Sequence, residues 1–387
     1  MADTSLVFPG GEFRRRVDRL QAQMASRDLD ALFLTGAADI FYVTGFLTRF
    51  WESPARPWFV IVPKTGAPVA VIPSIGAALM ARTWINDIRT WAAPHPTDDG
   101  VTLLSDTLCE LVPERGRIGV PMGLETHLRM PLRDYDRVAK AIAPRHFTDG
   151  TDAVQRVREI KSEAEIDAIR ATCTLAARAF ARVPEFAAAG QPLDGVFRDF
   201  QRALLQEGAD WVSYTAGAAG PDGYADVISP AAAEPLRPGD ILMLDTGAVR
   251  NGYFCDIDRN YAIGPASDAA RRVHDALWHA TEDTLAALRP GLLARDVHRL
   301  LCEGLTRRGV EPGGGRLGHG LGITLTEWPS VTPLDTTPLR EGMVLTLEPG
   351  AVVAPGRVLV HEENIVLRAE GAELLSPRAP SHLPEIL

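Results

Sequence analysis

The feature that most constrains the fold is the run of residues 241–264, in which two apolar, strand-like segments flank an Asn-Gly pair at 251–252. An Asn-Gly pair between two such segments is the strongest short-range signal of a β-hairpin with a two-residue turn. That turn fixes the register and pairs Asp245 with Asp258. Asp256 is then a diagonal neighbour on the same face, because side chains alternate along a strand with period two. The sequence therefore predicts three aspartates on one face of one hairpin.

Residues 343–367 repeat this arrangement. With a three-residue loop at 354–356, Glu348 lies directly opposite Glu362. The flanks of both hairpins are apolar, as in buried strands, so an interpretation of these acids as solvent-facing fits poorly. Two like charges about 4 Å apart cost on the order of 4 kcal/mol at an effective dielectric constant of 20. Shared protons or cations must therefore neutralise the group.

A histidine, His319, lies between two glycines in the run 316–330. Glycine on either side leaves room for another group to approach the imidazole. Oxygen ligands together with one imidazole suit a pair of divalent metal ions. We therefore expect cations to neutralise the carboxylates and a metal ion to lie next to His319.

The composition, 46% apolar and 23% charged residues, is that of a soluble globular protein. The net charge of −10 argues against nucleic acid and anionic membranes as partners. The N-terminal residues have no export-signal pattern, and no apolar run approaches the roughly 20 residues of a membrane span. The glycine-rich stretches 217–223 and 312–316 match no phosphate-binding fingerprint. Four widely spaced cysteines without a CxxC pair argue against a zinc–cysteine cluster and fit a cytoplasmic protein.

A chain of 387 residues favours two domains. Residues 12–29 have the pattern of an amphipathic helix. Ser162 and Glu165 form a capping box that begins a long helix, which is a natural start for the second domain. Between these helices, short apolar runs alternate with helical stretches, which predicts an α/β domain over the first ~150 residues. The expected strands are 31–36, 58–63 and 68–73, and the expected helices lie around 102–112 and 133–142.

Together these residues resemble the metallopeptidase family of "pita-bread" fold that includes methionine aminopeptidase, Xaa-Pro aminopeptidase, prolidase and the non-peptidase creatinase. The resemblance rests on an Asp in LDTG, a second Asp eleven residues later, a GHG histidine, a Glu before Pro-Gly and a final Glu. It covers almost the whole chain and implies an α+β protein. A creatinase-type α/β N-terminal domain is expected over residues 1–155, and a pita-bread catalytic domain over residues 156–387.

The resemblance implies two divalent metal ions per chain (Mn, Co, Zn or Fe) and a homodimer. The implied ligands are Asp245, Asp256, His319, Glu348 and Glu362, with Asp256 and Glu362 bridging both ions. The implied mechanism is attack on an amide carbon by a metal-bridging hydroxide, with Glu348 moving the proton.

Three positions depart from the peptidase pattern. Thr326 stands where these peptidases carry a histidine that steadies the oxyanion, although Glu327 and Pro329 keep the rest of that motif. Ile228 stands at the position of a histidine near the leaving group, and Val360 at that of an arginine. Losing one oxyanion donor typically costs roughly 10²–10³ in rate. We expect an intact metal centre, a catalytic role for Thr326, and substrate contacts at Ile228, Glu327 and Val360.

Asp258 shares the face of the ligands, at a position where the family more often has threonine. The alternative is an ion pair with Arg259, but strand parity points Arg259 the other way. We therefore expect Asp258 to be an additional catalytic residue. His361, next to Glu362, points to the opposite face and is interpreted as structural.

Three functions are compatible with these residues. The first is a dinuclear-metal hydrolase of small peptides or amides, with Xaa-Pro dipeptides as the first substrates to test. The second is a C–N hydrolase or lyase of a small metabolite, similar to creatinase, ectoine hydrolase or a dimethylsulfoniopropionate lyase. The missing histidines favour this class, and the complete ligand set argues against a metal-free enzyme. The third is a non-enzymatic binding module, which would not need all five ligands.

Overall fold

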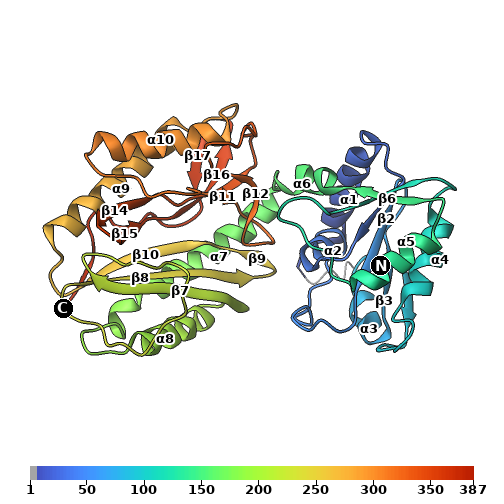
Figure 1. The fold of residues 1–387 in the computed structure, drawn as a ribbon, viewed down its shortest axis with the longest axis horizontal. Helices are drawn as coiled ribbons and strands as arrows, with labels where there is room; N and C mark the ends of the chain where they lie inside the picture. The colour runs from blue at the N-terminus through green and yellow to red at the C-terminus, as the bar shows by residue number, and fades with distance from the viewer. Residues whose placement is uncertain (1–6) are drawn as a thin grey trace. The chain divides into compact units, whose positions relative to one another are not determined.

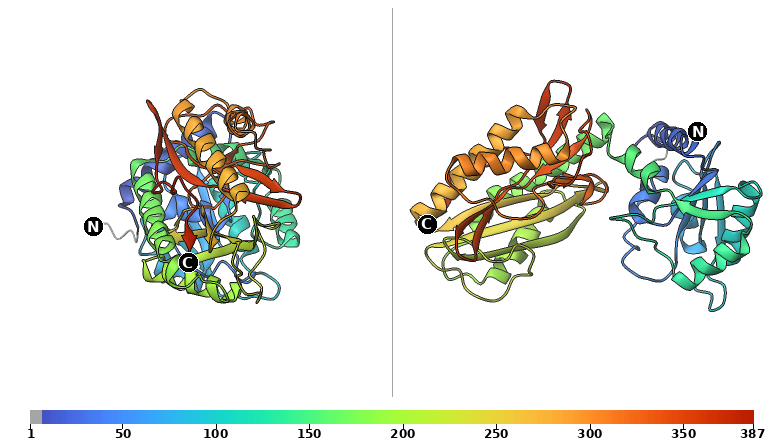
Figure 2. Two further views of the ribbon diagram at one scale, coloured as in Figure 1. Left: turned by 90° about the vertical axis from the view of Figure 1, so that its left-hand side faces the viewer. Right: turned by 45° about the horizontal axis from the view of Figure 1, so that its top comes forward.

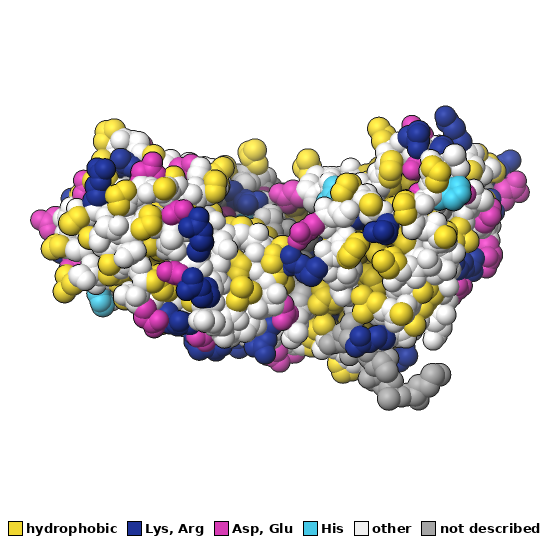
Figure 3. Space-filling model, turned by 90° about the horizontal axis from the view of Figure 1, so that it is seen from below, with side chains coloured by type: hydrophobic (Ala, Val, Ile, Leu, Met, Phe, Trp, Pro, Cys, Tyr) yellow, Lys and Arg dark blue, Asp and Glu magenta, His cyan; other side chains and the backbone are white. Residues whose placement is uncertain are grey.

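A computed structural model describes residues 7–387, and the chain divides into two compact units after Arg158 (Figure 1). Each unit has its own sheets and its own buried apolar core. Among the described residues, no helix has both the length and the apolar character needed to cross a membrane. On the face shown in Figure 3, basic and acidic side chains are interspersed over each unit.

The first unit is a six-stranded mixed sheet in the order β4-β3-β2-β1-β5-β6. Figure 1 shows α1, α2 and α6 on one side of this sheet and α4 and α5 on the other. The core between the sheet and α4 and α5 includes Phe33, Ile61, Leu104 and Val138. The elements are α1 (Gly10–Ala25), β1 (Ala31–Leu34), α2 (Ala37–Thr44), β2 (Phe59–Pro63), β3 (Val69–Pro73), α3 (Ala77–Met80), β4 (Asp87–Trp91), α4 (Val101–Leu111), β5 (Arg117–Val120), α5 (Leu132–Ala141), β6 (His146–Asp149) and α6 (Thr151–Arg158).

The elements of the first unit agree with the predicted alternation of strands and helices. Helix α1 buries Phe13, Val17, Leu20 and Met24 along one face, as its apolar periodicity predicts. It ends at Ala25, four residues earlier than expected, because the chain turns there and reaches a positive φ of 55° at Asp28.

The second unit contains three sheets and four long helices. The sheet β18-β10-β8-β7 contacts α7 and α8, and the strands of the other half contact α9. Figures 1 and 2 show the α9–α10 pair and the α7–α8 pair on opposite sides of the strands. The elements are α7 (Glu163–Ala181), α8 (Leu193–Gln206), β7 (Trp211–Pro221), β8 (Asp240–Arg250), β9 (Tyr253–Phe254), β10 (Ile257–Ile263), α9 (Asp268–Ala287), α10 (Ala294–Arg307), β11 (His319–Gly320), β12 (Glu327–Ser330), β13 (Val344–Leu347), β14 (Gly350–Ala354), β15 (Arg357–Val360), β16 (Glu363–Arg368), β17 (Gly371–Leu374) and β18 (Glu385–Ile386).

The predicted capping box at the start of α7 is present. The side chain of Ser162 accepts from the N–H of Glu165, and the carboxylate of Glu165 accepts from the N–H of Ser162. This reciprocal pair satisfies two of the free N–H groups that begin every helix.

The hairpin that carries the aspartates has the predicted register. Asp245 in β8 pairs with Asp258 in β10. The turn residues Asn251 and Gly252 have φ angles of 54° and 80°, the left-handed conformation that a two-residue hairpin turn requires.

The glutamate hairpin reaches the predicted register by a different turn. Leu347 pairs with Glu363 and Gly350 pairs with Val360, which places Glu348 opposite Glu362. The predicted three-residue loop is wrong in detail. The structure has a two-residue turn at 355–356, and a bulge between Val352 and Ala354 supplies the extra residue.

Candidate metal centre

Three carboxylates from two different sheets converge in the second unit. Asp245 lies within β8, Asp256 immediately precedes β10, and Glu362 immediately precedes β16. One oxygen from each lies within 4.8 Å of the others. Asp256 and Glu362 are almost completely buried, at 4% and 2% exposure.

The imidazole of His319 faces this group. Its Nδ1 lies 2.8 Å from the carbonyl oxygen of Gly320. A carbonyl only accepts, so Nδ1 carries the hydrogen and Nε2 keeps its lone pair, which is the usual arrangement for a metal-ligating histidine. That Nε2 lies 3.3 Å from Asp256 Oδ2 and 3.9 Å from Glu348 Oε1.

The electrostatics of the group are those of crowded buried acids. Burial, and then the charge of Asp256, raise the pKa values of Asp245 and Glu362 well above their usual range. Burial also raises the pKa of Glu348 to about 7, although His319 and Arg316 oppose this rise. Burial opposes a charge on His319, but its contacts with Asp256 and Glu348 outweigh that effect, so its pKa is raised. Without a cation, the folded protein therefore holds these acids partly protonated.

The donor set fits divalent metal ions. Glu362 Oε1 and Asp258 Oδ1 are buried and have no hydrogen-bond partner among the described residues. Buried carboxylate oxygens rarely lack a partner in native proteins, and an ion is one accepted reason. Hard oxygen ligands with one imidazole suit Mn, Zn, Co or Fe better than a soft metal. Asp245, Asp256, Glu362, His319 and Glu348 would hold such ions.

Sequence reasoning missed Tyr214, which contacts two of these carboxylates. Its hydroxyl lies 2.8 Å from Asp245 Oδ1 and 2.5 Å from Asp256 Oδ1. Burial, and then the neighbouring charges of Asp256 and Asp245, raise its pKa well above the usual value, so the hydroxyl keeps its proton. β7 carries a bulge between Val212 and Thr215, which changes the register at Tyr214. A period-two reading of the sequence gives no signal of that bulge.

The two glycines around His319 have a different role from the one expected. A Cβ at Gly318 would lie 2.3 Å from the carbonyl oxygen of Thr346, and a Cβ at Gly320 would lie 2.3 Å from that of Trp328. The glycines therefore admit neighbouring backbone, and the expectation that they make room beside the ring is corrected. Because neither glycine has a side chain, β11 can lie close to β12 and β13.

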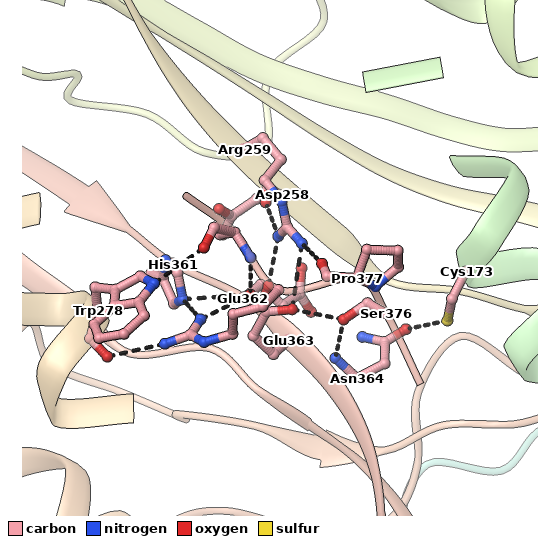
Figure 4. Close-up of polar contacts among 12 residues, drawn as sticks. Cys173, Asp258, Arg259, Trp278, His361, Glu362, Glu363, Asn364, Ser376 and Pro377 are labelled. Atoms are coloured by element: carbon pink, nitrogen blue, oxygen red, sulfur yellow. Dashed lines mark hydrogen bonds and ion pairs between the residues drawn. The ribbon is translucent and has the colours of Figure 1, made fainter. Parts of the chain in front are cut away.

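A polar network connects β10 with the start of β16, and Figure 4 shows its contacts around Arg259, Glu362 and Glu363. Asn364 Oδ1 accepts from the N–H of Asp256 at 3.1 Å, and its Nδ2 donates to the carbonyl of the same residue. Glu363 is fully buried and accepts from Arg259, Ser376, Arg378 and the N–H of Ala379. Arg259 also donates to the carbonyl of Glu362 at 2.8 Å.

Asp258 lies where its strand parity predicts, opposite Asp245. It is 4% exposed, and burial raises its pKa to about 8, although Arg259 opposes this rise. His361 is also buried, and its Nε2 lies 2.6 Å from Arg378 Nη1, which is a contact with the polar network around Glu363.

Thr326, expected to be catalytic, and the three positions expected to contact substrate have different surroundings. Ile228 is 84% exposed, so its side chain faces solvent instead of the buried ligands. Val360 packs against an apolar cluster that includes residues of α9. Thr326 is half-buried at the end of the loop that follows His319. Glu327 is 7% exposed, and its carboxylate contacts Lys161 Nζ at 3.0 Å.

Known proteins match the chain over nearly its whole length. It is 30% identical over 380 residues to the probable dipeptidase PepE of Mycobacterium tuberculosis, with 97% of each covered. It is 22% identical over 366 residues to the Xaa-Pro dipeptidase of Pyrococcus furiosus, with 94% of this chain and 98% of that protein covered. The crystal structure of dipeptidase PepE from Mycobacterium ulcerans superposes with a TM-score of 0.83 at 27% identity, covering 98% of this chain and 99% of that one.

A prolidase from Thermococcus sibiricus shares the fold with a TM-score of 0.85 at 23% identity, over 96% of this chain and 99% of that one. Residues 16–160 match the model of the Creatinase/Prolidase N-terminal domain. Residues 167–370 match the model of metallopeptidase family M24. This range includes all the candidate metal ligands: Asp245, Asp256, His319, Glu348 and Glu362. The chain belongs to metallopeptidase family M24 and is a metal-dependent hydrolase of the pita-bread fold.

Proposed function

We propose that this protein is a dipeptidase that uses two divalent metal ions to hydrolyse short peptides, including some with proline after the scissile bond. The observation that carries the proposal is the convergence of Asp245, Asp256, Glu362 and His319 with a buried, unpartnered oxygen on Glu362. The 30% identity with a probable dipeptidase over 97% of the chain supports the substrate class.

In this proposal, the ions would be held by Asp245, Asp256, His319, Glu348 and Glu362. Ions held there would supply Lewis acidity toward a peptide carbonyl and a water that is nucleophilic at neutral pH. Glu348 suits the transfer of a proton from water to the leaving amine, because its carboxylate lies beside the other candidate ligands, with Oε1 3.9 Å from His319 Nε2. Asp258 and Thr326 are proposed as further catalytic groups, and Ile228, Glu327 and Val360 stay predictions for the substrate side.

The proposed domains are residues 156–387 as the catalytic domain and residues 1–155 as a creatinase-like N-terminal domain. Family resemblance supports a homodimer. The four cysteines are unpaired, which supports a reducing, cytoplasmic location.

The test is a panel of dipeptides and tripeptides, with and without proline in the second position, assayed with Mn, Co and Zn after removal of bound metal. We expect chelator-sensitive cleavage of dipeptides, with narrow activity on Xaa-Pro substrates because Thr326 and Ile228 replace histidines. No cleavage of any peptide with any metal would contradict the proposal.

A second candidate is hydrolysis of a small non-peptide amide or amine. Ile228 and Thr326 favour it, because neither offers the imidazole that peptidases of the family carry at these positions. Small N-substituted amino acids in the same panel separate the two candidates.

A further inference from the structure

A buried ion pair lies beside the loop that connects β11 with β12. Lys161 Nζ and Glu327 Oε2 are 3.0 Å apart, and their side chains are 1% and 5% exposed. Residues this polar are almost never buried without a partner, and a buried pair is retained at a considerable desolvation cost. Such a pair therefore needs an explanation beyond general stability.

The second carboxylate oxygen of Glu327 holds the loop from within. Its Oε1 accepts from the N–H of Ile323 at 3.0 Å, the N–H of Thr324 at 3.2 Å and the hydroxyl of Thr324 at 3.3 Å. A Cβ at Gly322 would lie 2.7 Å from the same carboxylate, so glycine lets Glu327 lie close to the loop backbone. One side chain thus defines the path of the loop that ends at Thr326.

Lys161 is itself fixed to the strand that leads to Glu348. Its N–H donates to the carbonyl of Gly342 at 2.9 Å, and Ile160 forms an isolated β-bridge with Met343. β13 begins at the next residue and ends directly before Glu348.

The loop also reaches the aspartate hairpin. The N–H of Phe254, two residues before Asp256, donates to the carbonyl of Gly322 at 2.9 Å. The Lys161–Glu327 pair therefore connects three segments that carry ligands: the loop after His319, the strand before Glu348 and the approach to Asp256.

We propose that Lys161 and Glu327 are positioning residues that hold the 321–327 loop, and with it Thr326, in the geometry needed for turnover. This inference rests on the proposed peptidase function only for its kinetic readout. It assigns Glu327 a contact with the protein's own loop, in place of the expected contact with substrate.

The experiment compares Lys161→Met, Glu327→Gln and the double variant Lys161→Met/Glu327→Gln in the full-length protein. Lys161→Met removes the cation that lies 3.0 Å from the buried Glu327 carboxylate, so we expect hydrogen exchange at Ile323 and Thr324 to accelerate at least tenfold. We expect kcat to fall about tenfold or more with KM within about twofold, because a misplaced catalytic group reduces transition-state stabilisation. Manganese affinity, measured by titration calorimetry, should stay within about threefold of the wild-type value.

The double variant separates positioning from simple loss of stability. A glutamine amide oxygen still accepts from Ile323 and Thr324, and no buried charge is left without a partner. The double variant should therefore recover both slow exchange in the loop and most of the wild-type kcat. Arg16→Met is the matched control, because Arg16 pairs with Glu12 in the first unit at 0% and 4% side-chain exposure. It should lower the melting temperature without lowering kcat.

Unchanged exchange and unchanged kcat in Lys161→Met would overturn the inference, as would an equal loss of kcat in Arg16→Met. If wild-type protein cleaves no peptide, the proposed function fails, while the exchange measurement still decides whether the pair holds the loop.

Discussion

At the scale of single residues, the centre is a group of acids that the fold crowds together without enough counter-charge. The hydroxyl of Tyr214 has one hydrogen to donate and lies within hydrogen-bond distance of both Asp245 and Asp256. Glu362 Oε1 has no hydrogen-bond partner among the described residues. Such a group destabilises the folded state until protons or cations neutralise it.

Replacing Glu362 with glutamine should separate metal binding from folding. In a chelator, Glu362→Gln should melt at or above the wild-type temperature, because one buried like charge is removed. Added manganese should raise the melting temperature of the wild type, by an amount equivalent to about 2.7 kcal/mol at 100 times Kd, and leave the variant unchanged. Glu370→Gln, an exposed change after β16, is the control and should behave as wild type. A full manganese shift in Glu362→Gln would contradict its assignment as a ligand.

In the metal-free protein, two buried carboxyls should contribute less stability as the pH rises. The folded-state pKa values of Asp258, about 8, and Glu348, about 7, lie above the usual 3.8 and 4.5. Between these limits each of these two carboxyls binds more protons in the folded state than in the unfolded state, so their contribution to stability is greatest near pH 4 and declines toward pH 8. Thermal melts in a chelator across this range measure the decline. Asp258→Asn should make the decline of melting temperature with pH shallower. An identical slope in this variant would mean that the pKa of Asp258 is not raised in the folded protein.

At the scale of secondary structure, local chemistry made part of the site predictable. The Asn-Gly turn and the period of two fixed which face carries Asp245, Asp256 and Asp258, because both act over a few residues. The bulge before Tyr214 and the approach of Thr346 to Gly318 were not predictable, because they depend on strands distant in sequence. The same holds for Glu327, whose partner Lys161 is 166 residues away.

Gly318 tests how closely the strands must pack. Its φ is 146°, and a Cβ there would lie 2.3 Å from a backbone oxygen that cannot move aside alone. Gly318→Ala should therefore displace β11 from β13, weaken manganese binding at least tenfold and lower the melting temperature by several degrees. Titration calorimetry and thermal melts measure both effects. Gly314→Ala, at a position with open space around it, should change neither.

At the scale of the whole molecule, the chain consists of two units with separate cores, and every metal-ligand candidate belongs to the second. A ligand stabilises only the unit whose folded form it binds. Scanning calorimetry should therefore show two transitions, of which only one moves when manganese is replaced by a chelator. In Glu362→Gln that transition should stay in place in both conditions. A single transition that shifts as a whole would mean that the units unfold cooperatively.

The ligand candidates lie on strands or directly beside them, whereas Ile228 lies within a connecting segment and Thr326 is the last residue of another. Substitutions are tolerated more readily in connecting segments than in strands that pack closely against the backbone of their neighbours. Descendants of this chain can therefore exchange one substrate for another while the inherited metal chemistry stays the same. Random libraries limited to residues 226–229 and 324–326 would sample that evolutionary freedom directly. Variants with new substrate preferences and unaltered manganese affinity should be common among them.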